Sequence, residues 1–406
     1  MPSRSGATDR IRLWAALVVV LGAMGCGDGA LGAPRAADRE VARRAASVDV
    51  ASEPAVAPEE IAAEEIAATL VVTPPAPAER LATLAMAPAR VEVAELIVPA
   101  GGVEPRGSFF AHADAPIVAS LASQSVVEVD RGEGGRSLSF KITLADGTRG
   151  NFKPEQSFNG MQWHSEIAAY HLDRELGLGR VAPVVGRRVA WSELREAAGG
   201  DGRIDELRVG EDGTLRGALV WWVPARPTPL PLEPGWERWL RIEGEPDAVT
   251  PFQRPNQVRD RQVIARPAEA PEPDTAERPA ELSDLIVFDY LIQNLDRWGG
   301  NNTNVRTLGP GGPLMFLDNA AGFVLRRPRV ALMDSRLAHV QRFRRSTIEA
   351  VRELDVERLQ ARMAEDPLAP ALDARQVANL EERRAHLLAH VDALVEDHGE
   401  DAVYAW

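Results

Sequence analysis

Alternating hydrophobic and polar positions predict a β-sheet in the middle of the chain. The segment 137–144 has an apolar residue at every second position, namely Leu138, Phe140, Ile142 and Leu144. This period of two is typical of a strand with one buried face. The apolar segment 125–129 precedes it across a glycine-rich loop at 131–136, and Gly147 marks a turn into a returning strand at 150–153. Strand, glycine loop, strand, hairpin and strand are therefore expected in this order.

The turn between the last two strands decides which of their residues stand opposite each other. A three-residue loop over 146–148 keeps the apolar side chains on one face and pairs Ile142 with Phe152. The same register pairs Lys141 with Lys153 on the other face. Two ammonium groups held side by side repel each other, and an anion between them would relieve that repulsion. The hairpin is thus a candidate phosphate-binding element.

A helix is expected directly after this sheet. Ser165 is a residue type typical of a helix N-cap, and Gly177 is typical of the position that follows a helix C-cap. Between them, an apolar stripe at helical spacing is formed by Ala168, Leu172 and Leu176. Glu166 lies in the first turn, where a helix dipole alone favours a carboxylate. A strand lysine such as Lys153 followed by a helix glutamate is also the pair that orients nucleotide phosphates in protein kinases.

The second half of the chain combines a buried helix with two aspartates. The segment 283–292 is apolar on nearly every side and predicts a helix enclosed by the core. Asp296 follows it and Asn301 comes five residues later, which is the spacing of the catalytic aspartate and the metal-binding asparagine in kinases. The short apolar strand 313–317 ends at Asp318, a suitable position for a carboxylate that holds Mg²⁺ or Mn²⁺ against phosphates. Each feature is common alone, but their order along the chain is that of a kinase.

Three other segments differ in composition from the predicted core. Residues 1–26 have a basic start, an apolar run and small residues before Cys26, which resembles a bacterial lipoprotein signal; a plain export signal is the alternative. Residues 27–105 are mostly Ala, Glu, Pro and Val and predict a disordered tether. The Pro-rich segment 224–280 predicts a long connection within the folded region, at the rim of a substrate site.

Charge and residue counts narrow the range of partners. The 406 residues include 60 acidic and 46 basic ones, and a net charge of −14 argues against a nucleic-acid surface, which needs clustered positive charge. The single cysteine excludes a disulfide framework and a cysteine-based zinc site. Lys141 and Lys153 are the only lysines of the sequence, and every other basic residue is arginine. A compact ammonium meets a phosphate as a point charge, a role that a planar guanidinium does not reproduce.

Three segments resemble one kinase family. The segments 165–189, 282–298 and 309–324 look like those of the secretory-pathway kinases that include four-jointed, the Golgi casein kinase and the glycosaminoglycan xylosylkinase. The third segment most resembles four-jointed. The resemblance extends over about 109–391 and is specific, because three long matches occur in the right order. The casein-kinase branch has histidine where Trp298 stands, so the substrate preference of that branch is not transferred.

The resemblance implies a fold and a division into domains. The fold would be α+β, with the two lobes of an atypical protein kinase: a small β-rich N-lobe with one helix and a mainly helical C-lobe. The N-lobe would comprise 106–223 and the C-lobe 281–406, joined by the connection at 224–280.

The resemblance also implies roles for individual residues. Lys153 would bind the phosphates of ATP with Glu166 as its partner. Asp296 would be the catalytic base, and Asp318 with Asn301 would hold Mg²⁺ or Mn²⁺. Lys141 joins the phosphate-binding set only on the strength of the predicted strand register.

The function implied is ATP- and metal-dependent transfer of a γ-phosphoryl group to a Ser/Thr hydroxyl of exported or surface proteins. The same residues would serve a kinase for the sugar hydroxyls of glycans. A nucleotide-binding pseudokinase, acting as a surface interaction module, is a further alternative. With lipid on Cys26 the protein would be exported and held in a bacterial cell envelope by that anchor alone, and nucleic acid is not an expected partner.

Overall fold

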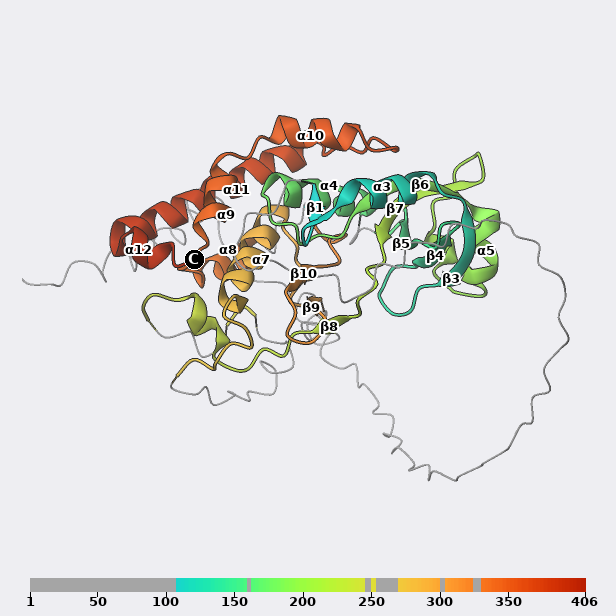
Figure 1. Ribbon diagram of the computed structural model, residues 1–406. Coiled ribbons are helices and arrows are strands. Elements are labelled where there is room, and N and C mark those ends of the chain that lie inside the picture. The colour runs from blue at the N-terminus through green and yellow to red at the C-terminus, as the bar shows by residue number, and fades with distance from the viewer. Residues whose placement is uncertain (1–106, 159–161, 245–249, 253–268, 300–303, 324–329) are drawn as a thin grey trace, which may run out of the picture. The chain divides into compact units, whose positions relative to one another are not determined.

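The computed structural model describes residues 107–158, 162–244, 250–252, 269–299, 304–323 and 330–406 (Figure 1). All of them lie in one compact unit, Thr83–Trp406. The segments 1–26 and 27–105 and the residues Cys26 and Asn301 lie outside the described residues. Within the described part, no helix is both long enough and apolar enough to cross a membrane.

The first half of the unit is rich in strands. Its elements are β1 (Ser108–Phe109), β2 (His112–Ala113), α3 (Asp114–Ser123), β3 (Val126–Arg131), β4 (Phe140–Leu144), β5 (Arg149–Pro154), α4 (Trp163–Glu175), β6 (Val184–Ala190), α5 (Trp191–Ala198), the 3₁₀-helix η2 (Ile204–Glu206) and β7 (Thr214–Trp221). Five strands form an antiparallel sheet in the order β3-β4-β5-β7-β6. Three helices accompany this sheet, where the sequence predicted one, and the apolar side chains of α3 and α5 pack with those of the sheet in one hydrophobic cluster.

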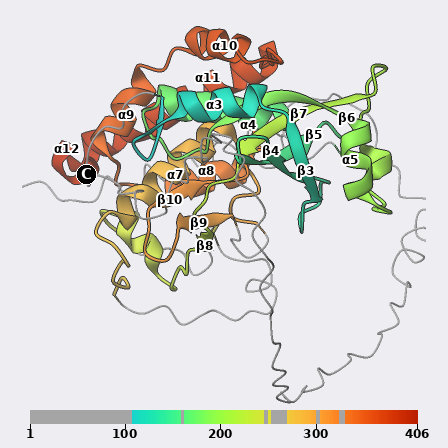
Figure 2. The same cartoon turned by 45° about the vertical axis from the view of Figure 1, so that its right-hand side comes forward.

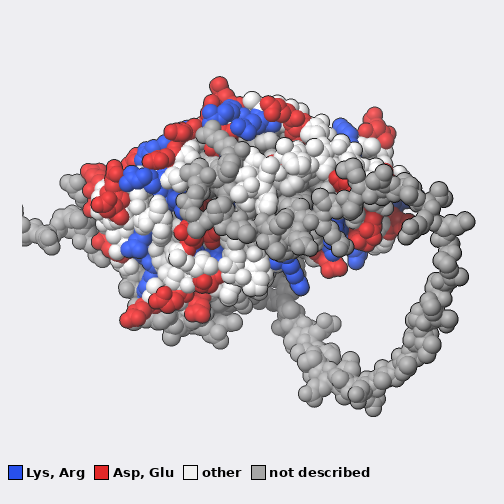
Figure 3. All heavy atoms as spheres, viewed as in Figure 1, with Lys and Arg blue, Asp and Glu red and all other residues white. Residues whose placement is uncertain are grey.

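The second half is mainly helical. Its elements are β8 (Pro227–Pro229), the 3₁₀-helix η3 (Trp236–Leu240), α7 (Arg278–Ile292), β9 (Val305–Leu308), β10 (Leu314–Phe316), α8 (Val330–Ala338), α9 (Arg345–Arg352), α10 (Val356–Ala364), α11 (Ala374–His398) and α12 (Glu400–Val403). Strands β10, β9 and β8 form a small antiparallel sheet. Helix α7 is buried almost throughout, as its apolar pattern predicted, and the predicted strand before Asp318 is present as β10. On the face drawn in Figure 3, acidic and basic side chains are interspersed.

The hairpin between β4 and β5 differs from the prediction by its loop. The loop comprises 145–147 and not 146–148, and the Leu144 N–H donates to the Thr148 carbonyl at 2.8 Å across it. Gly147 has a φ of 85°, the left-handed conformation that closes a three-residue hairpin loop and that glycine adopts without strain. The position of this glycine therefore decides the register, and the loop lies one residue earlier than the apolar pattern alone suggested.

The observed register contradicts the predicted pairing of the two lysines. Phe140 stands opposite Phe152, and Lys141 stands opposite Asn151, not opposite Lys153. The change amounts to two positions along one strand, so the alternation of faces is preserved. Lys141 and Lys153 consequently share one face of the sheet as diagonal neighbours.

Helix α4 begins two residues before the predicted N-cap. Ser165 lies inside its first turn, and its hydroxyl donates to the Gly322 carbonyl at 2.8 Å instead of capping the helix. The predicted end is confirmed: Gly177 has a φ of 65°, and the Leu178 N–H donates to the Asp173 carbonyl at 3.0 Å. This is the hydrogen bond of a Schellman motif. Helix α4 is thus tied to the helical part at its start and capped by glycine at its end.

The Pro-rich connection contributes to the core. Trp236, Leu240 and Phe252 from it are buried. The Trp236 ring stacks on the Trp298 ring with 5.6 Å between centroids and an interplanar angle of 4°. Strand β8 has proline at both ends and lies at the edge of its sheet, where a missing N–H is tolerated. The sequence predicted a connection here but not this packing.

The stability of the protein should fall as the pH falls from 6.5 to 4. Burial, followed by the charges of Arg362 and Arg174, lowers the pKa of His171 on α4 to about 4. The unfolded chain takes up a proton at pH values where folded His171 does not, so the contribution is present above pH 6.5 and is lost on acidification. It amounts to about 3 kcal/mol at most, since one pKa unit equals about 1.4 kcal/mol. Urea unfolding at several pH values measures it, and His171→Gln should flatten the profile; an identical slope in both proteins would refute this assignment.

Candidate active site

Three side chains predicted from separate segments meet at one point. Lys153 comes from β5, Glu166 from the first turn of α4, and Asp318 from the loop after β10. The Lys153 ammonium donates to Glu166 Oε1 at 2.5 Å and to Asp318 Oδ1 at 2.7 Å. The structure thus joins the β-rich part to the helical part through one lysine.

Glu166 is also bound to the backbone of the loop after β10. Its Oε1 accepts the N–H groups of Asn319 at 3.1 Å and of Ala320 at 3.0 Å. The Glu166 side chain is 3% exposed. A buried carboxylate needs such partners, because an unpaired charge in the interior is costly. The position of Glu166 is therefore coupled to the position of Asp318, its neighbour in this loop.

The charges within this group stabilise one another. Burial acts to lower the pKa of Lys153, but the charges of Asp318 and Glu166 outweigh it and raise that pKa above its ordinary value. The Lys153 ammonium, in turn, lowers the pKa of Asp318 against the opposing effect of burial. Lys153 is consequently an ammonium, and Asp318 a carboxylate, at neutral pH.

Asp318 is suited to hold a metal ion together with phosphates. Its φ of 58° is unusual for a residue other than glycine, and such backbone strain is often found at functional sites. Its side chain is 34% exposed, and carboxylate oxygens are the ligands that Mg²⁺ and Mn²⁺ prefer. Among the described residues, no group of three or more His, Cys, Asp or Glu is arranged to hold a metal ion. A metal bound with one carboxylate and with nucleotide phosphates fits this donor set.

Asp296 lies at the solvent side of the loop that follows α7. The Asp296 N–H donates to Asn294 Oδ1 at 3.1 Å, and Asn294 Nδ2 donates to the Asp318 carbonyl at 3.1 Å. Asn304 Nδ2 lies 3.4 Å from Asp296 Oδ2. A Cβ at Gly299 would lie 2.9 Å from Asp296 Oδ1, so glycine leaves space for this carboxylate. Asn294, which the sequence analysis did not identify, thus connects the segments of both aspartates.

A buried arginine beside Asp296 connects the same segments from below the surface. Arg297 is completely buried, and its Nε donates to Asp289 Oδ1 at 3.1 Å. Its Nη2 donates to Asn319 Oδ1 at 2.6 Å, and its Nη1 donates to the Leu317 carbonyl. Burial raises the pKa of Asp289, and the Arg297 charge opposes this shift. The sequence analysis did not identify the pair of Asp289 and Arg297. A visible signal was the aspartate within a largely apolar helix, followed eight residues later by an arginine.

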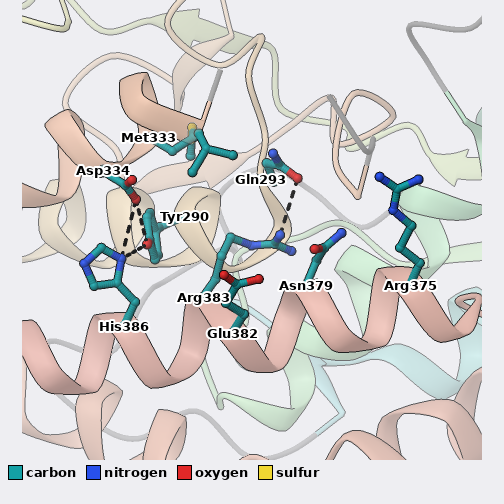
Figure 4. A pocket seen from close by; sticks show the side chains of 10 residues that line it. Tyr290, Gln293, Met333, Asp334, Arg375, Asn379, Glu382, Arg383 and His386 are labelled. Carbon is teal, nitrogen blue, oxygen red and sulfur yellow. Dashed lines mark hydrogen bonds and ion pairs between the residues drawn. The ribbon is translucent and has the colours of Figure 1, made fainter. Parts of the chain in front are cut away.

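A second arginine fixes the end of α7. Arg383 of α11 donates to the Leu291 carbonyl through Nε at 2.9 Å and Nη2 at 2.7 Å. Its Nη1 donates to Gln293 Oε1 at 3.3 Å (Figure 4). These bonds satisfy a carbonyl at the helix end, where no backbone partner is available. Gln293 and Arg383 line one side of a cavity of about 240 Å³ between α7, α8 and α11. The chain enters the Asp296 loop from this fixed end.

Lys141 does not join the group around Lys153. Its ammonium lies 3.8 Å from Glu133 Oε1 in the glycine-rich loop and 5.6 Å from the centroid of the Trp222 ring. Lys141 and Lys153 lie on the same face of the sheet. Phosphate binding by Lys141 therefore stays a prediction.

Comparison with known proteins supports the resemblance read from the sequence. The family model described as "Golgi casein kinase, C-terminal, Fam20" matches residues 261–403, which include Asp296 and Asp318. Four-jointed box protein 1 of Mus musculus is 30% identical over 241 residues, which cover 54% of this chain and 47% of that protein. Glycosaminoglycan xylosylkinase of Homo sapiens is 26% identical, over 71% of this chain and 76% of that protein. The chain has homologues among the Fam20-family kinases.

The fold is likewise similar to solved structures. A crystal structure of the Golgi casein kinase with Mn/ADP bound matches with a TM-score of 0.52 and 19% identity, over 73% of this chain and 80% of that chain. The predicted α+β kinase-like fold is therefore confirmed. The chain spans about half the length of the four-jointed relatives that it matches. Pseudokinase FAM20A of Mus musculus is also similar, with 25% identity over 67% of this chain and 56% of that protein.

Replacing Glu166 by glutamine should make Lys153 more reactive toward amine reagents. Loss of one of the two charges that raise the pKa of Lys153 increases its neutral fraction, by about tenfold for each pKa unit at a fixed pH below that pKa. Because the sequence has two lysines, mass spectrometry after partial acylation gives the ratio of Lys153 to Lys141 modification within one sample. A ratio that is the same in the natural protein and in Glu166→Gln would contradict the ion pair.

Proposed function

We propose that this protein is an ATP- and metal-dependent kinase that transfers the γ-phosphoryl group to a Ser or Thr hydroxyl of exported or surface proteins. The observation that carries the proposal is the meeting of Lys153, Glu166 and Asp318 at one point, with Asp296 connected to Asp318 through Asn294. The proposed lobes are 106–223 and 281–406, and the site lies where residues from both meet.

The phosphate-binding role follows from the donors of Lys153. An ammonium has three N–H donors, and Glu166 and Asp318 occupy two of them. The third is directed to a phosphate oxygen of ATP in this proposal. Asp318 Oδ1 accepts from Lys153, and the Asp318 carboxylate would also hold the metal ion, with Asn301 as the second proposed ligand. The metal ion, Mg²⁺ or Mn²⁺, would neutralise charge on the phosphates.

Asp296 is proposed to act on the acceptor. Its exposed carboxylate accepts the proton of the acceptor hydroxyl while the hydroxyl oxygen forms a bond to the γ-phosphorus. The bond between this phosphorus and the β,γ-bridging oxygen breaks, and ADP leaves with the electron pair of that bond. Asn294 accepts the Asp296 N–H, and the side chain of Arg297, the next residue, is anchored at the Leu317 carbonyl. In this proposal the chemistry rests on positioning and electrostatics.

Two alternatives follow from the relatives. The glycosaminoglycan xylosylkinase of Homo sapiens is similar to more of this chain than four-jointed is, and supports a sugar hydroxyl as acceptor. The similarity to pseudokinase FAM20A supports nucleotide binding without transfer. Against the pseudokinase stands the assembled group of Lys153, Glu166 and Asp318.

We also propose that the protein is exported and lipid-anchored through Cys26. The basic and apolar composition of 1–26 supports export. A relative from Homo sapiens that is 25% identical over 69% of this chain and 54% of its own length is named extracellular serine/threonine protein kinase FAM20C. In this proposal, lipid on Cys26 is the sole contact with the membrane.

Incubation of the full chain with γ-labelled ATP, Mg²⁺ or Mn²⁺, and a panel of acidic proteins and glycans tests the function. Label on Ser or Thr of a protein supports the proposal, and label on a sugar hydroxyl supports the glycan kinase. A rise of the melting temperature with ATP and metal, but without transfer to any acceptor, would favour the pseudokinase. If neither transfer nor a thermal shift occurs, the nucleotide-binding site itself is refuted.

A further inference from the structure

Helix α10 binds α4 on the side opposite to Glu166. Glu175 follows Glu166 by nine residues, about two and a half helical turns, and therefore lies on the opposite face of α4. Its side chain is completely buried, and its Oε2 accepts from Arg358 Nε at 2.6 Å. Arg362 Nε forms an ion pair with Oε1 of the same carboxylate. Both arginines belong to α10, which lies beside α4 in both ribbon views (Figures 1 and 2).

The turn after α10 makes a second contact with the β-rich part. Asp366 Oδ2 accepts the Gly186 N–H of β6 at 2.7 Å. A Cβ at Gly186 would lie 2.3 Å from Asp366 Oδ1 and 2.8 Å from the Leu368 Cβ, so this close approach requires glycine. Strand β6 is the edge of the five-stranded sheet and pairs with β7 alone in that sheet. The segment 355–368 thus contacts the β-rich part at α4 and at the sheet edge.

The opposite end of α4 is also held by the helical part. The Gln162 N–H donates to the Ala320 carbonyl at 2.8 Å, and Ser165 donates to Gly322. These contacts place Glu166 at the loop after β10, but they belong to the first turn alone. Toward its other end, α4 packs in the main hydrophobic core through Leu172 and Leu176. The same end carries Glu175, whose buried charge is stable in place only while its arginine partners remain.

We propose that the segment 355–368 is an intramolecular brace that keeps α4 in the position where Glu166 binds Lys153. Arg358 and Arg362 are positioning residues that act through Glu175. Without them, the buried carboxylate would need water, and the end of α4 would move outward to obtain it. The effect of the brace on catalysis rests on the proposed kinase function. Its effect on the reactivity of Lys153 does not.

The full chain with Arg358→Gln and Arg362→Gln tests the brace. Their side chains are 40% and 37% exposed, so the substitutions remove little buried side-chain volume. The unpaired Glu175 charge is expected to lower the stability, and the rescue variant described below separates this effect from positioning. We expect the ratio of Lys153 to Lys141 acylation to rise about threefold or more, because Glu166 leaves Lys153 in part of the molecules. If transfer is detected, the KM for ATP should rise with a smaller change in kcat. An affinity for ATP and an acylation ratio that both equal those of the natural protein would overturn the proposal.

A matched control comes from α9. Arg345 and Arg352 are 44% and 41% exposed and form ion pairs with Glu400 and Asp392, away from α4. Arg345→Gln with Arg352→Gln removes the same charge and the same number of arginine side chains. This control should keep the natural acylation ratio, and an equal rise in both double variants would overturn the brace as a specific device.

A rescue experiment separates positioning from general destabilisation. Adding Glu175→Gln to the Arg358→Gln and Arg362→Gln variant removes the buried charge, and glutamine side chains hydrogen-bond as neutral partners. The acylation ratio should return toward the natural value; a ratio that rises further would contradict the proposed mechanism. If the ratio behaves as expected but the natural protein transfers no phosphate, the brace stands and the kinase function fails.

Discussion

Asp296→Asn is expected to reduce phosphoryl transfer by about a thousandfold, since a positioned general base contributes roughly 10²- to 10⁴-fold. Asparagine has nearly the same shape, and the backbone N–H that binds Asn294 remains. The variant should therefore fold normally and keep its affinity for ATP. The measurement is the initial rate of label transfer to the best acceptor, together with nucleotide affinity.

The matched control for this variant is Asp401→Asn. Asp401 is exposed on α12, so the control removes the same charge without touching the site. It should transfer phosphate at the natural rate. If Asp296→Asn retains more than a tenth of the natural rate, Asp296 is not the base that accepts the acceptor proton.

Arg297→Met is expected to cause the largest loss of stability, about 3–5 kcal/mol, because it leaves the buried Asp289 charge without its partner. The same substitution removes the donors to the Leu317 carbonyl and to Asn319 Oδ1, the acceptors directly before and after Asp318 in the chain. The free energy of unfolding by urea measures the effect. In the double variant Asp289→Leu with Arg297→Met, the unpaired charge is absent and much of the stability should return. Equal stability of Arg297→Met and the natural protein would contradict the role of this ion pair.

The sequence allowed a prediction of which residues would come together, because the segments that carry them follow one another in the order known from kinases. Lys153, Glu166, Asp296 and Asp318 were predicted as site residues from strand, helix and spacing patterns and from the family resemblance. The structure brings Lys153, Glu166 and Asp318 into direct contact, and their roles stay a prediction. Their types are unusual for the apolar segments that carry them. The order of these segments is shared with kinases, so the sequence pointed to a common site before the geometry was known.

The hairpin register could not be predicted from hydrophobic alternation. Shifting the partner strand by two residues keeps every apolar side chain on the same face, so Phe152 can face Ile142 or Phe140 with the same burial. The left-handed conformation of Gly147 decides between the two registers. The predicted register therefore placed Lys141 on the correct face of the sheet but opposite the wrong residue of the partner strand.

The supporting residues could not be predicted because their partners are distant in sequence. Asn294 binds backbone 24 residues away, and Glu175 pairs with Arg358 across 183 residues. A glutamate at the end of a helix reads as a solvent-exposed residue when only local spacing is considered. Its burial under α10 is a property of tertiary packing.

The central claim is that Lys153, Glu166 and Asp318 form a nucleotide and metal site, which the kinase and the pseudokinase alternatives both require. Calorimetric titration with a non-hydrolysable ATP analogue tests this claim most directly, because it needs no acceptor. The account predicts that the full natural chain binds the analogue in the presence of Mn²⁺ or Mg²⁺ and that Asp296→Asn binds it equally well. Asp318→Asn should lose about tenfold or more in affinity, since it removes the proposed metal ligand and one partner of Lys153. Equal binding by Asp318→Asn and the natural protein, or no binding by the natural protein, would contradict the account.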